Sequence, residues 1–237
     1  MGNKPSDLVL RGHSKPVYAC CCSKDGRFLV TASGDQSLKV WDLKSWSCIR
    51  SFVGHSSAIY CCSISKNDKY VVSGALDGSM KIWWMESGLE LASIREHKEA
   101  VMAVSFSTDG KRALSASADK TVIVWSVTIE EGEKNIQLVK SHSLVGHKAA
   151  VNSVAVAPDS QSAVSGSSDT TLKIWNLNSG KETRVLTGHS DPVLCCVVSP
   201  CGKFILSSSQ DNTTRLWCWS TGKELKQVSP SLPLSRC

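Results

Sequence analysis

The chain has 237 residues, 41% of them hydrophobic, and a formal net charge of +6 at pH 7. This length suits one large all-β domain or two ordinary domains, and the hydrophobic content is enough to bury a substantial core. The excess of Lys and Arg is mild and includes no dense basic block of the kind that marks a nucleic-acid arm. No apolar run approaches the ~20 residues that a membrane-spanning helix needs.

Residues 1–6 read as a short polar leader, MGNKPS, which matches the M-G-x-x-x-[ST] pattern for N-myristoylation of Gly2. Chance matches to so short a pattern are common, and one acyl chain anchors a protein only marginally. A membrane partner is therefore expected only if Gly2 is myristoylated. The first dozen residues also lack the apolar region of a secretory signal.

Five histidines recur along the rest of the chain and mark a repeating unit, namely His13, His55, His97, His147 and His189. An aspartate comes 22 residues after each of them, at Asp35, Asp77, Asp119, Asp169 and Asp211. A tryptophan follows six residues later, at Trp41, Trp83, Trp125, Trp175 and Trp217. Because both intervals hold in all five copies, one supersecondary unit is repeated five times.

Each unit predicts four strands. A short run rich in Val, Ile, Ala and Cys follows every histidine, at 17–22, 59–64, 101–106, 151–156 and 193–198. These runs are too short for helices and read as strands buried on both faces. Turn residues separate them from a second strand, such as 28–33, a third that ends on the tryptophan, such as 37–41, and a fourth, such as 48–52. The period of ~42 residues is that of a propeller blade.

The Gly-His, Asp and Trp positions at this spacing resemble the WD-repeat β-propeller family. The resemblance implies an all-β propeller of four-stranded antiparallel blades over residues 7–229, with repeats at about 12–53, 54–95, 96–145, 146–187 and 188–229, and an irregular tail at 230–237. Five repeats fit a small closed ring or part of a larger one. The repeat pattern stops at Pro230, where the next Gly-His pair would begin. This favours an incomplete ring from a truncated product or isoform, with blade faces left open.

In the family, the histidine bonds a Ser or Thr hydroxyl that also bonds the indole, and the aspartate lies in a turn against the histidine. The resemblance assigns this hydroxyl to Ser33, Ser117, Ser167 and Ser209. The second repeat has Ala75 at that position, and the third has Glu96 in place of the glycine before its histidine. These two repeats are therefore predicted to be the weakest blades.

Catalysis is not expected, because a hydrolase needs one activated nucleophile beside an oxyanion site and not five copies of one arrangement. The phosphate-binding pattern G-x-x-x-x-G-K-[ST] is absent, and we expect no cofactor. The eleven cysteines include no C-x-x-C pair, so no metal site is predicted. They read as small buried residues in a reducing cytosol, so we expect a cytoplasmic protein, with the nucleus as the alternative location.

One repeat carries eight extra residues around positions 130–134, predicted to lengthen the hairpin between its third and fourth strands. A solvated loop is the simpler interpretation, and a binding loop is the alternative.

By the resemblance, partner contacts concentrate on the top face. The positions carried over as partner-binding are Tyr18, Tyr60, Leu76, Met102, Asn152, Leu194 and Gln210. None is charged, so we expect an uncharged, partly aromatic surface on a non-enzymatic scaffold that binds proteins or peptides and no small-molecule substrate. Channel-lining residues without a ligand are the simpler alternative.

Two other functions stay open. A substrate receptor of a ubiquitin ligase often carries Trp-Asp-x-Arg, and the nearest match here is Trp41-Asp42-Leu43-Lys44. An RNA-associated propeller would use the scattered Lys and Arg of the opposite turns, although nucleic acid is an unlikely partner for so mild a charge.

Overall fold

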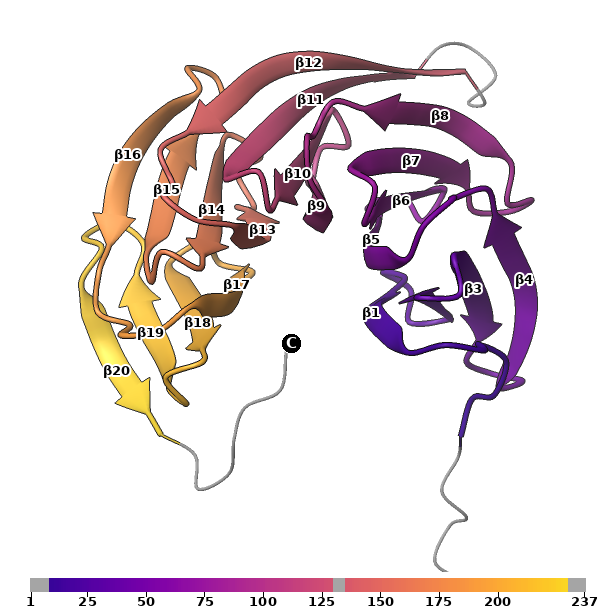
Figure 1. Cartoon of the computed structure of the whole chain (residues 1–237), viewed down its shortest axis with the longest axis horizontal. Coiled ribbons are helices and arrows are strands. Elements are labelled where there is room, and N and C mark those ends of the chain that lie inside the picture. Colours follow the sequence, from indigo (N-terminus) through magenta and orange to yellow (C-terminus); the bar gives the residue numbers. More distant parts are fainter. Residues whose placement is uncertain (1–8, 130–134, 230–237) are drawn as a thin grey trace, which may run out of the picture.

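The structure is a computed structural model that describes residues 9–129 and 135–229. These residues form twenty strands in five separate four-stranded antiparallel sheets, in each of which the strands lie in chain order (Figure 1). The predicted all-β propeller of four-stranded blades is therefore confirmed. No helix in the described ranges is long and apolar enough to cross a membrane.

We number the sheets as blades 1 to 5. Blade 1 contains β1 (Val17–Cys22), β2 (Phe28–Ser33), β3 (Ser37–Asp42) and β4 (Ser47–Val53). Blade 2 contains β5 (Ile59–Ile64), β6 (Tyr70–Ala75), β7 (Ser79–Trp84) and β8 (Glu90–Arg95). Blade 3 contains β9 (Val101–Phe106), β10 (Arg112–Ser117), β11 (Thr121–Ile129) and β12 (Ile136–Val145).

Blade 4 contains β13 (Val151–Val156), β14 (Ser162–Ser167), β15 (Leu172–Asn176) and β16 (Lys181–Leu186). Blade 5 contains β17 (Val193–Val198), β18 (Phe204–Ser209), β19 (Thr214–Cys218) and β20 (Glu224–Val228). The expected lengthening of one hairpin is seen in β11 and β12, which have nine and ten residues. Residues 130–134 at the tip of that hairpin lie outside the described residues.

The blades stand around an open arc with their first strands on the inside, and a wide gap separates blade 1 from blade 5 (Figure 1). The alternative of a closed five-blade ring is thus not adopted. Neighbouring blades pack face to face, and the core lies between them. At the first junction, for example, Val30, Val40 and Phe52 of blade 1 form one buried cluster with Ile59 and Trp83 of blade 2.

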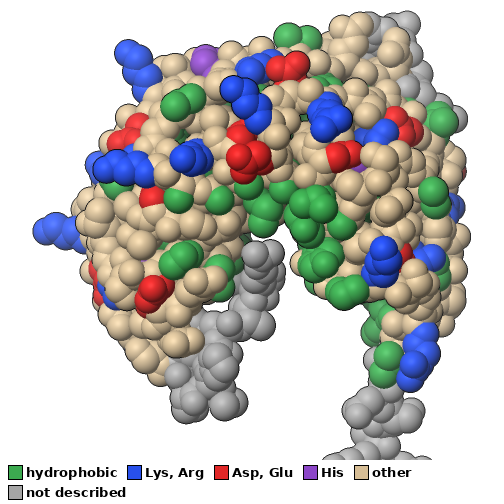
Figure 2. All heavy atoms as spheres, viewed as in Figure 1, with side chains coloured by type: hydrophobic (Ala, Val, Ile, Leu, Met, Phe, Trp, Pro, Cys, Tyr) green, Lys and Arg blue, Asp and Glu red, His purple; other side chains and the backbone are tan. Residues whose placement is uncertain are grey.

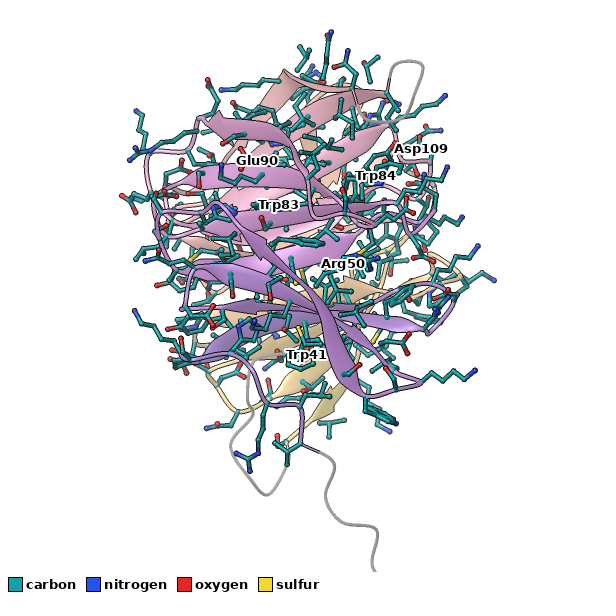
Figure 3. All side chains as sticks on the ribbon, turned by 90° about the vertical axis from the view of Figure 1, so that its right-hand side faces the viewer. Trp41, Arg50, Trp83, Trp84, Glu90 and Asp109 are labelled. Carbon is teal, nitrogen blue, oxygen red and sulfur yellow. The ribbon has the colours of Figure 1, made fainter. Side chains whose placement is uncertain are left out.

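A register shift directs each tryptophan into this core. In every blade the pairing of the third and fourth strands slips by one residue directly before the tryptophan, as between Val40 and Trp41 or Leu216 and Trp217. Such a bulge bends the strand and redirects the following side chain. Trp41 and Trp83 consequently occupy the same place in successive blades (Figure 3) and are 3% and 1% exposed.

The prediction that the cysteines are buried is partly wrong. Cys61 and Cys196 are buried, but Cys20 and Cys22 on β1 are exposed. The repeat counterparts of Cys20 and Cys22 in blade 2 are Cys62 and Ile64, which pack against blade 1. Among the described residues no blade precedes blade 1 to cover these positions, so the equivalent strand exposes its thiols.

Candidate functional site

A closed chain of hydrogen bonds joins the three repeated residues in blade 5. His189 Nδ1 lies 2.8 Å from Asp211 Oδ2, and its Nε2 lies 2.8 Å from Ser207 Oγ. The Trp217 indole N–H donates to the same Ser207 oxygen at 2.9 Å. Because the carboxylate needs a donor, His189 carries its proton on Nδ1, and Ser207 donates its hydroxyl proton to Nε2. Every polar atom of the buried chain is then satisfied.

Blades 1, 3 and 4 repeat this arrangement, with all three distances between 2.8 and 2.9 Å. The shared hydroxyls are those of Thr31, Ser115 and Ser165. The complete network in blade 3 means that Glu96 removes none of its members. In the described residues, no three side chains of His, Cys, Asp or Glu are placed to hold a metal ion.

The serines predicted for the hydroxyl position have a different role, so that assignment is wrong. The hydroxyl between histidine and tryptophan lies two residues earlier on the same strand, at Ser207 and not Ser209. Ser209 instead accepts the Asp211 backbone N–H at 3.1 Å and donates to the Asp191 carbonyl at 2.9 Å. Ser33, Ser117 and Ser167 make the equivalent pair of bonds. They hold the aspartate turn against the loop that follows the histidine.

Blade 2 departs from the pattern, although not through Ala75 as predicted. Its central hydroxyl is present, since Ser73 Oγ lies 2.7 Å from His55 Nε2 and accepts from Trp83 at 2.9 Å. Ser57 also supplies the missing turn hydroxyl, because it accepts the Asp77 backbone N–H at 3.1 Å.

The bond that blade 2 lacks is the one between histidine and aspartate. His55 Nδ1 lies 3.2 Å from Ser79 Oγ, and Asp77 Oδ2 instead accepts the Ser56 hydroxyl at 2.8 Å. The turn of blade 2 also contains Gly78, directly after Asp77. A Cβ at Gly78 would come within 2.6 Å of the His97 carbonyl oxygen, so the turn approaches blade 3 as closely as only glycine permits.

Hydrogen bonding keeps the five aspartates ionised. Burial opposes the charge of Asp211, but bonds from Thr213, His189 and backbone N–H groups outweigh it and lower the pKa to about 2. The pKa of Asp169 is lowered to about 2 by a similar set of donors, and that of Asp77 to about 2 by bonds from Ser79 and Ser56 without a histidine. The pKa values of Asp35 and Asp119 are lowered as well. Burial lowers the pKa of His55 to about 4, helped by the nearby Lys81 charge.

This arrangement binds the strands together and leaves no reactive group free. Ser207 is 1% exposed, and its oxygen already lies between an imidazole and an indole. A nucleophile must reach a substrate carbon beside an oxyanion site, and a hydroxyl enclosed in this way has no path to one. The His, Asp and Trp positions therefore stabilise the blade interior.

The inner strands of the arc line a groove of about 380 Å³. Five of the predicted partner-binding residues lie together along it, namely Tyr18, Tyr60, Met102, Asn152 and Leu194. Figure 2 shows hydrophobic side chains gathered along this inner edge. Leu76 and Gln210 are exposed but do not line the groove. None of the described residues that line the groove is charged.

Tyr18 and Tyr60 form an edge-to-face pair across blades 1 and 2, with ring centroids 5.0 Å apart. Tyr18 remains 43% exposed. Asn152, by contrast, is already engaged, because its side-chain amide donates to Ser168 Oγ at 2.9 Å and to the Val193 carbonyl at 2.8 Å. It therefore ties blade 4 to blade 5, and both bonds come from its amide nitrogen.

The sequence prediction missed the cysteines of the groove. Cys20, Cys62 and Cys195 are among its lining residues. Cys20 and Cys62 come two residues after Tyr18 and Tyr60, but the strand pairing shifts register at each tyrosine. Alternation along the strand therefore does not predict which side these cysteines face, and the sequence carries no signal for them. Gly2, the predicted lipidation site, lies outside the described residues.

Comparison with known proteins agrees with this architecture. The WD domain, G-beta repeat family matches five segments, residues 6–42, 46–83, 88–126, 138–176 and 180–218. A segment of 40 residues, 17% of the chain, is 50% identical to telomerase protein component 1 from the rat (Rattus norvegicus) and covers 2% of that protein. A segment of 43 residues, 18% of the chain, is 35% identical to transcription initiation factor TFIID subunit 5 from Drosophila melanogaster and covers 6% of that protein. A segment of the same length is 37% identical to the ribosome biogenesis protein BOP1 homolog from Monosiga brevicollis and covers 5% of that protein.

These relatives are thus matched over single repeats and small parts of their length, whereas the family match covers most of the chain. WD repeats generally form non-enzymatic scaffolds that bind other proteins. The five matched segments and the five four-stranded blades together show that the chain belongs to the WD-domain, G-beta-repeat family.

Proposed function

We propose that this chain is a protein-interaction scaffold that binds an uncharged, apolar or aromatic segment of a partner protein at the tyrosine pair of the inner groove. The observation that carries the proposal is the Tyr18–Tyr60 pair, which spans two blades and leaves Tyr18 43% exposed. The groove beside it is lined, within residues 9–129 and 135–229, by uncharged side chains. Large, rigid aromatic side chains in a partly desolvated concave site are the usual anchors of protein interfaces.

The chemistry of the groove favours this class of partner. Met102 and Leu194 extend the apolar lining from the tyrosines to blades 3 and 5. A phosphorylated or strongly acidic segment would need Arg or Lys to pair with its charge, and the described lining residues include neither. An uncharged segment avoids the cost of burying an unpaired charge.

The RNA alternative has less support. It would rely on the basic turns, where Arg112 already donates to the Ser160 carbonyl at 2.7 Å and Arg27 lies 3.6 Å from Asp42. Side chains engaged within the fold are less available for phosphate.

Affinity purification followed by mass spectrometry tests the proposal. The chain with both Tyr18→Ala and Tyr60→Ala is compared with the native chain and with a control that carries Val53→Ala and Val145→Ala. Val53 and Val145 are 77% and 71% exposed on the outer strands. Partners that the native chain and the control recover should be lost from the tyrosine variant.

A partner identified in this way is then titrated against the purified proteins. The tyrosine variant should bind it at least ~10-fold more weakly, because truncation of an interface hot spot costs ~2 kcal/mol or more. Equal affinity for the native chain and the tyrosine variant would exclude the groove mouth as the binding site.

A further inference from the structure

The two ends of the arc expose residues whose repeat counterparts are completely buried. Val17 of blade 1 is 50% exposed. Its counterparts at the start of the inner strand of the other blades are each 0% exposed, namely Ile59, Val101, Val151 and Val193. The difference follows from position, because each of those residues packs against the preceding blade, and no blade precedes Val17 in the part of the chain that the structure describes.

At the other end of the arc, the outward face of blade 5 also exposes residues whose repeat counterparts are buried. Leu206 is 43% exposed, whereas its counterparts Val30, Val72, Leu114 and Val164 are each 0% exposed. Val197 and Val228 on the same face are 46% and 50% exposed. We call Val197, Phe204, Leu206, Leu216 and Val228 the blade-5 end face. The blade-1 end face consists of Val17, Cys20, Cys22, Leu29 and Leu43.

The internal junctions show what covers each kind of face. Between blades 4 and 5, Val164 and Ile174 pack in one cluster with Val193 and Ile205. Val164 and Ile174 occupy the repeat positions of Leu206 and Leu216, while Val193 and Ile205 occupy those of Val17 and Leu29. The other junctions join the same two sets of positions. Each end face is therefore complementary to the other end face, and not to itself.

We propose that the chain associates head to tail with a second copy of itself, with the blade-5 end face of one copy against the blade-1 end face of the next. Within one copy these faces lie on opposite sides of the gap and do not meet (Figure 1). A second copy supplies the same apolar surface that covers every internal junction. The contact is heterologous, so each copy keeps one free face and the assembly can grow beyond two copies.

The segment before blade 1 opposes this contact. Leu10 occupies the repeat position of Phe52 and of Val228, and residues Val9 to Arg11 border a cavity of about 440 Å³ beside Trp41. In the proposed contact, β20 of the arriving copy takes that place, so residues 9–11 must move aside. The association is therefore weaker than packing within the chain and depends on protein concentration.

Light scattering coupled to size-exclusion chromatography of the full chain, over a range of concentrations, tests the proposal with two variants. Val17→Lys places a charge on the blade-1 end face, and Leu206→Lys places one on the blade-5 end face. Each variant alone should stay monomeric, with the association midpoint raised at least ~100-fold, because a buried unpaired charge costs several kcal/mol. Both side chains are already exposed in the monomer, so thermal unfolding should be little changed.

Mixing the two variants distinguishes the head-to-tail contact from a self-complementary interface. The intact blade-5 end face of the Val17→Lys copy can still bind the intact blade-1 end face of the Leu206→Lys copy. The mixture should therefore form a one-to-one dimer and nothing larger. A self-complementary interface would not be rescued by mixing, and that result would overturn the proposal.

Val185→Lys provides the matched control. Val185 is 41% exposed on β16, away from both end faces, and its repeat counterparts are Ser51, Ser93, Ser143 and Gln227. This variant should associate as the native chain does. A native chain that stays monomeric at every concentration, or aggregates that all variants form alike, would also contradict the proposal. Cys20 and Val197 belong to both an end face and the groove lining, but the substituted Val17 and Leu206 do not line the groove. The two variants therefore leave the tyrosine pair and the groove lining unchanged.

Discussion

The hydroxyl of Ser56 donates to Asp77 Oδ2 at 2.8 Å, in the place where a histidine bonds the aspartate in the other four blades. Asp77 is therefore held by neutral hydroxyl groups, and His55 is left with Ser79 as its partner on Nδ1. Blade 2 keeps every network residue but not the bond that closes the network. This difference makes the five repeats unequal in ways that can be measured.

Asp211→Ala should lower the free energy of unfolding more than Asp77→Ala. Asp211 accepts bonds from His189 and Thr213, and its removal leaves the Nδ1–H of a fully buried histidine with only the Thr213 hydroxyl, 3.3 Å away. We expect a loss of ~3 kcal/mol for Asp211→Ala and about 1 kcal/mol less for Asp77→Ala. Urea unfolding of both variants checks the order, and equal midpoints would show that the His–Asp bond contributes nothing.

Ser207→Ala should destabilise the chain more than Ser209→Ala. The first substitution leaves both the Trp217 indole N–H and His189 Nε2 without their shared partner, at a cost of ~2–4 kcal/mol. The second removes a turn hydroxyl, and blade 2 already has Ala75 at that position. We expect ~1 kcal/mol for it. Thermal unfolding of the two variants is the measurement, and the reverse order would restore the original assignment of Ser209.

Stability should fall as the pH is lowered from 6.5 towards 4. The pKa of His55 is about 4 in the folded chain and near 6.5 when unfolded, so in this window the unfolded chain binds the extra proton. His147, with its pKa also lowered mainly by burial, acts in the same direction. His55 alone accounts for a change on the order of 3 kcal/mol.

The variant His55→Gln isolates this contribution. Its free energy of unfolding should depend less on pH between 6.5 and 4 than that of the native chain. Below pH 4 both proteins should lose further stability, because the aspartates with a pKa of about 2 are ionised in the folded chain and protonated in the unfolded one. Parallel pH profiles above pH 4 would contradict the role given to His55.

Gly78→Ala should destabilise the chain more than Gly110→Ala. Both glycines have positive φ, at 81° and 70°, so both substitutions strain the backbone by ~1 kcal/mol. The added methyl group at Gly110 meets no atom within 4 Å, whereas at Gly78 it meets the His97 carbonyl oxygen at 2.6 Å. The extra cost at Gly78 should reach ~1–3 kcal/mol. Comparing the two melting temperatures removes the shared φ effect.

Much of the blade could be read from the chain alone because its signals are local. The intervals from His189 to Asp211 and Trp217 hold in every repeat, and short β-branched runs between turn residues define strands without reference to neighbours. Tyr18 and Tyr60 were placed together for the same reason, since they occupy one repeat position on consecutive blades. Their contact at 5.0 Å follows from the repeat itself.

The network hydroxyl could not be chosen in this way. Ser207 and Ser209 lie two residues apart on β18, so both project to the same side of the strand. Which of them reaches the indole depends on the pairing of Ile205 with Trp217 and on the register shift before Trp217. Pairing between strands is a long-range property that a spacing within the chain does not specify.

The end faces give the clearest division between sequence and tertiary structure. The sequence makes Val17 equivalent to Val193 and Leu206 equivalent to Val164, because the repeat assigns each pair the same local environment. Their burial nevertheless differs, with Val17 half exposed and Val193 fully buried. Burial of a blade face requires another blade against it, and the packing of the five blades into an open arc decides which faces receive one.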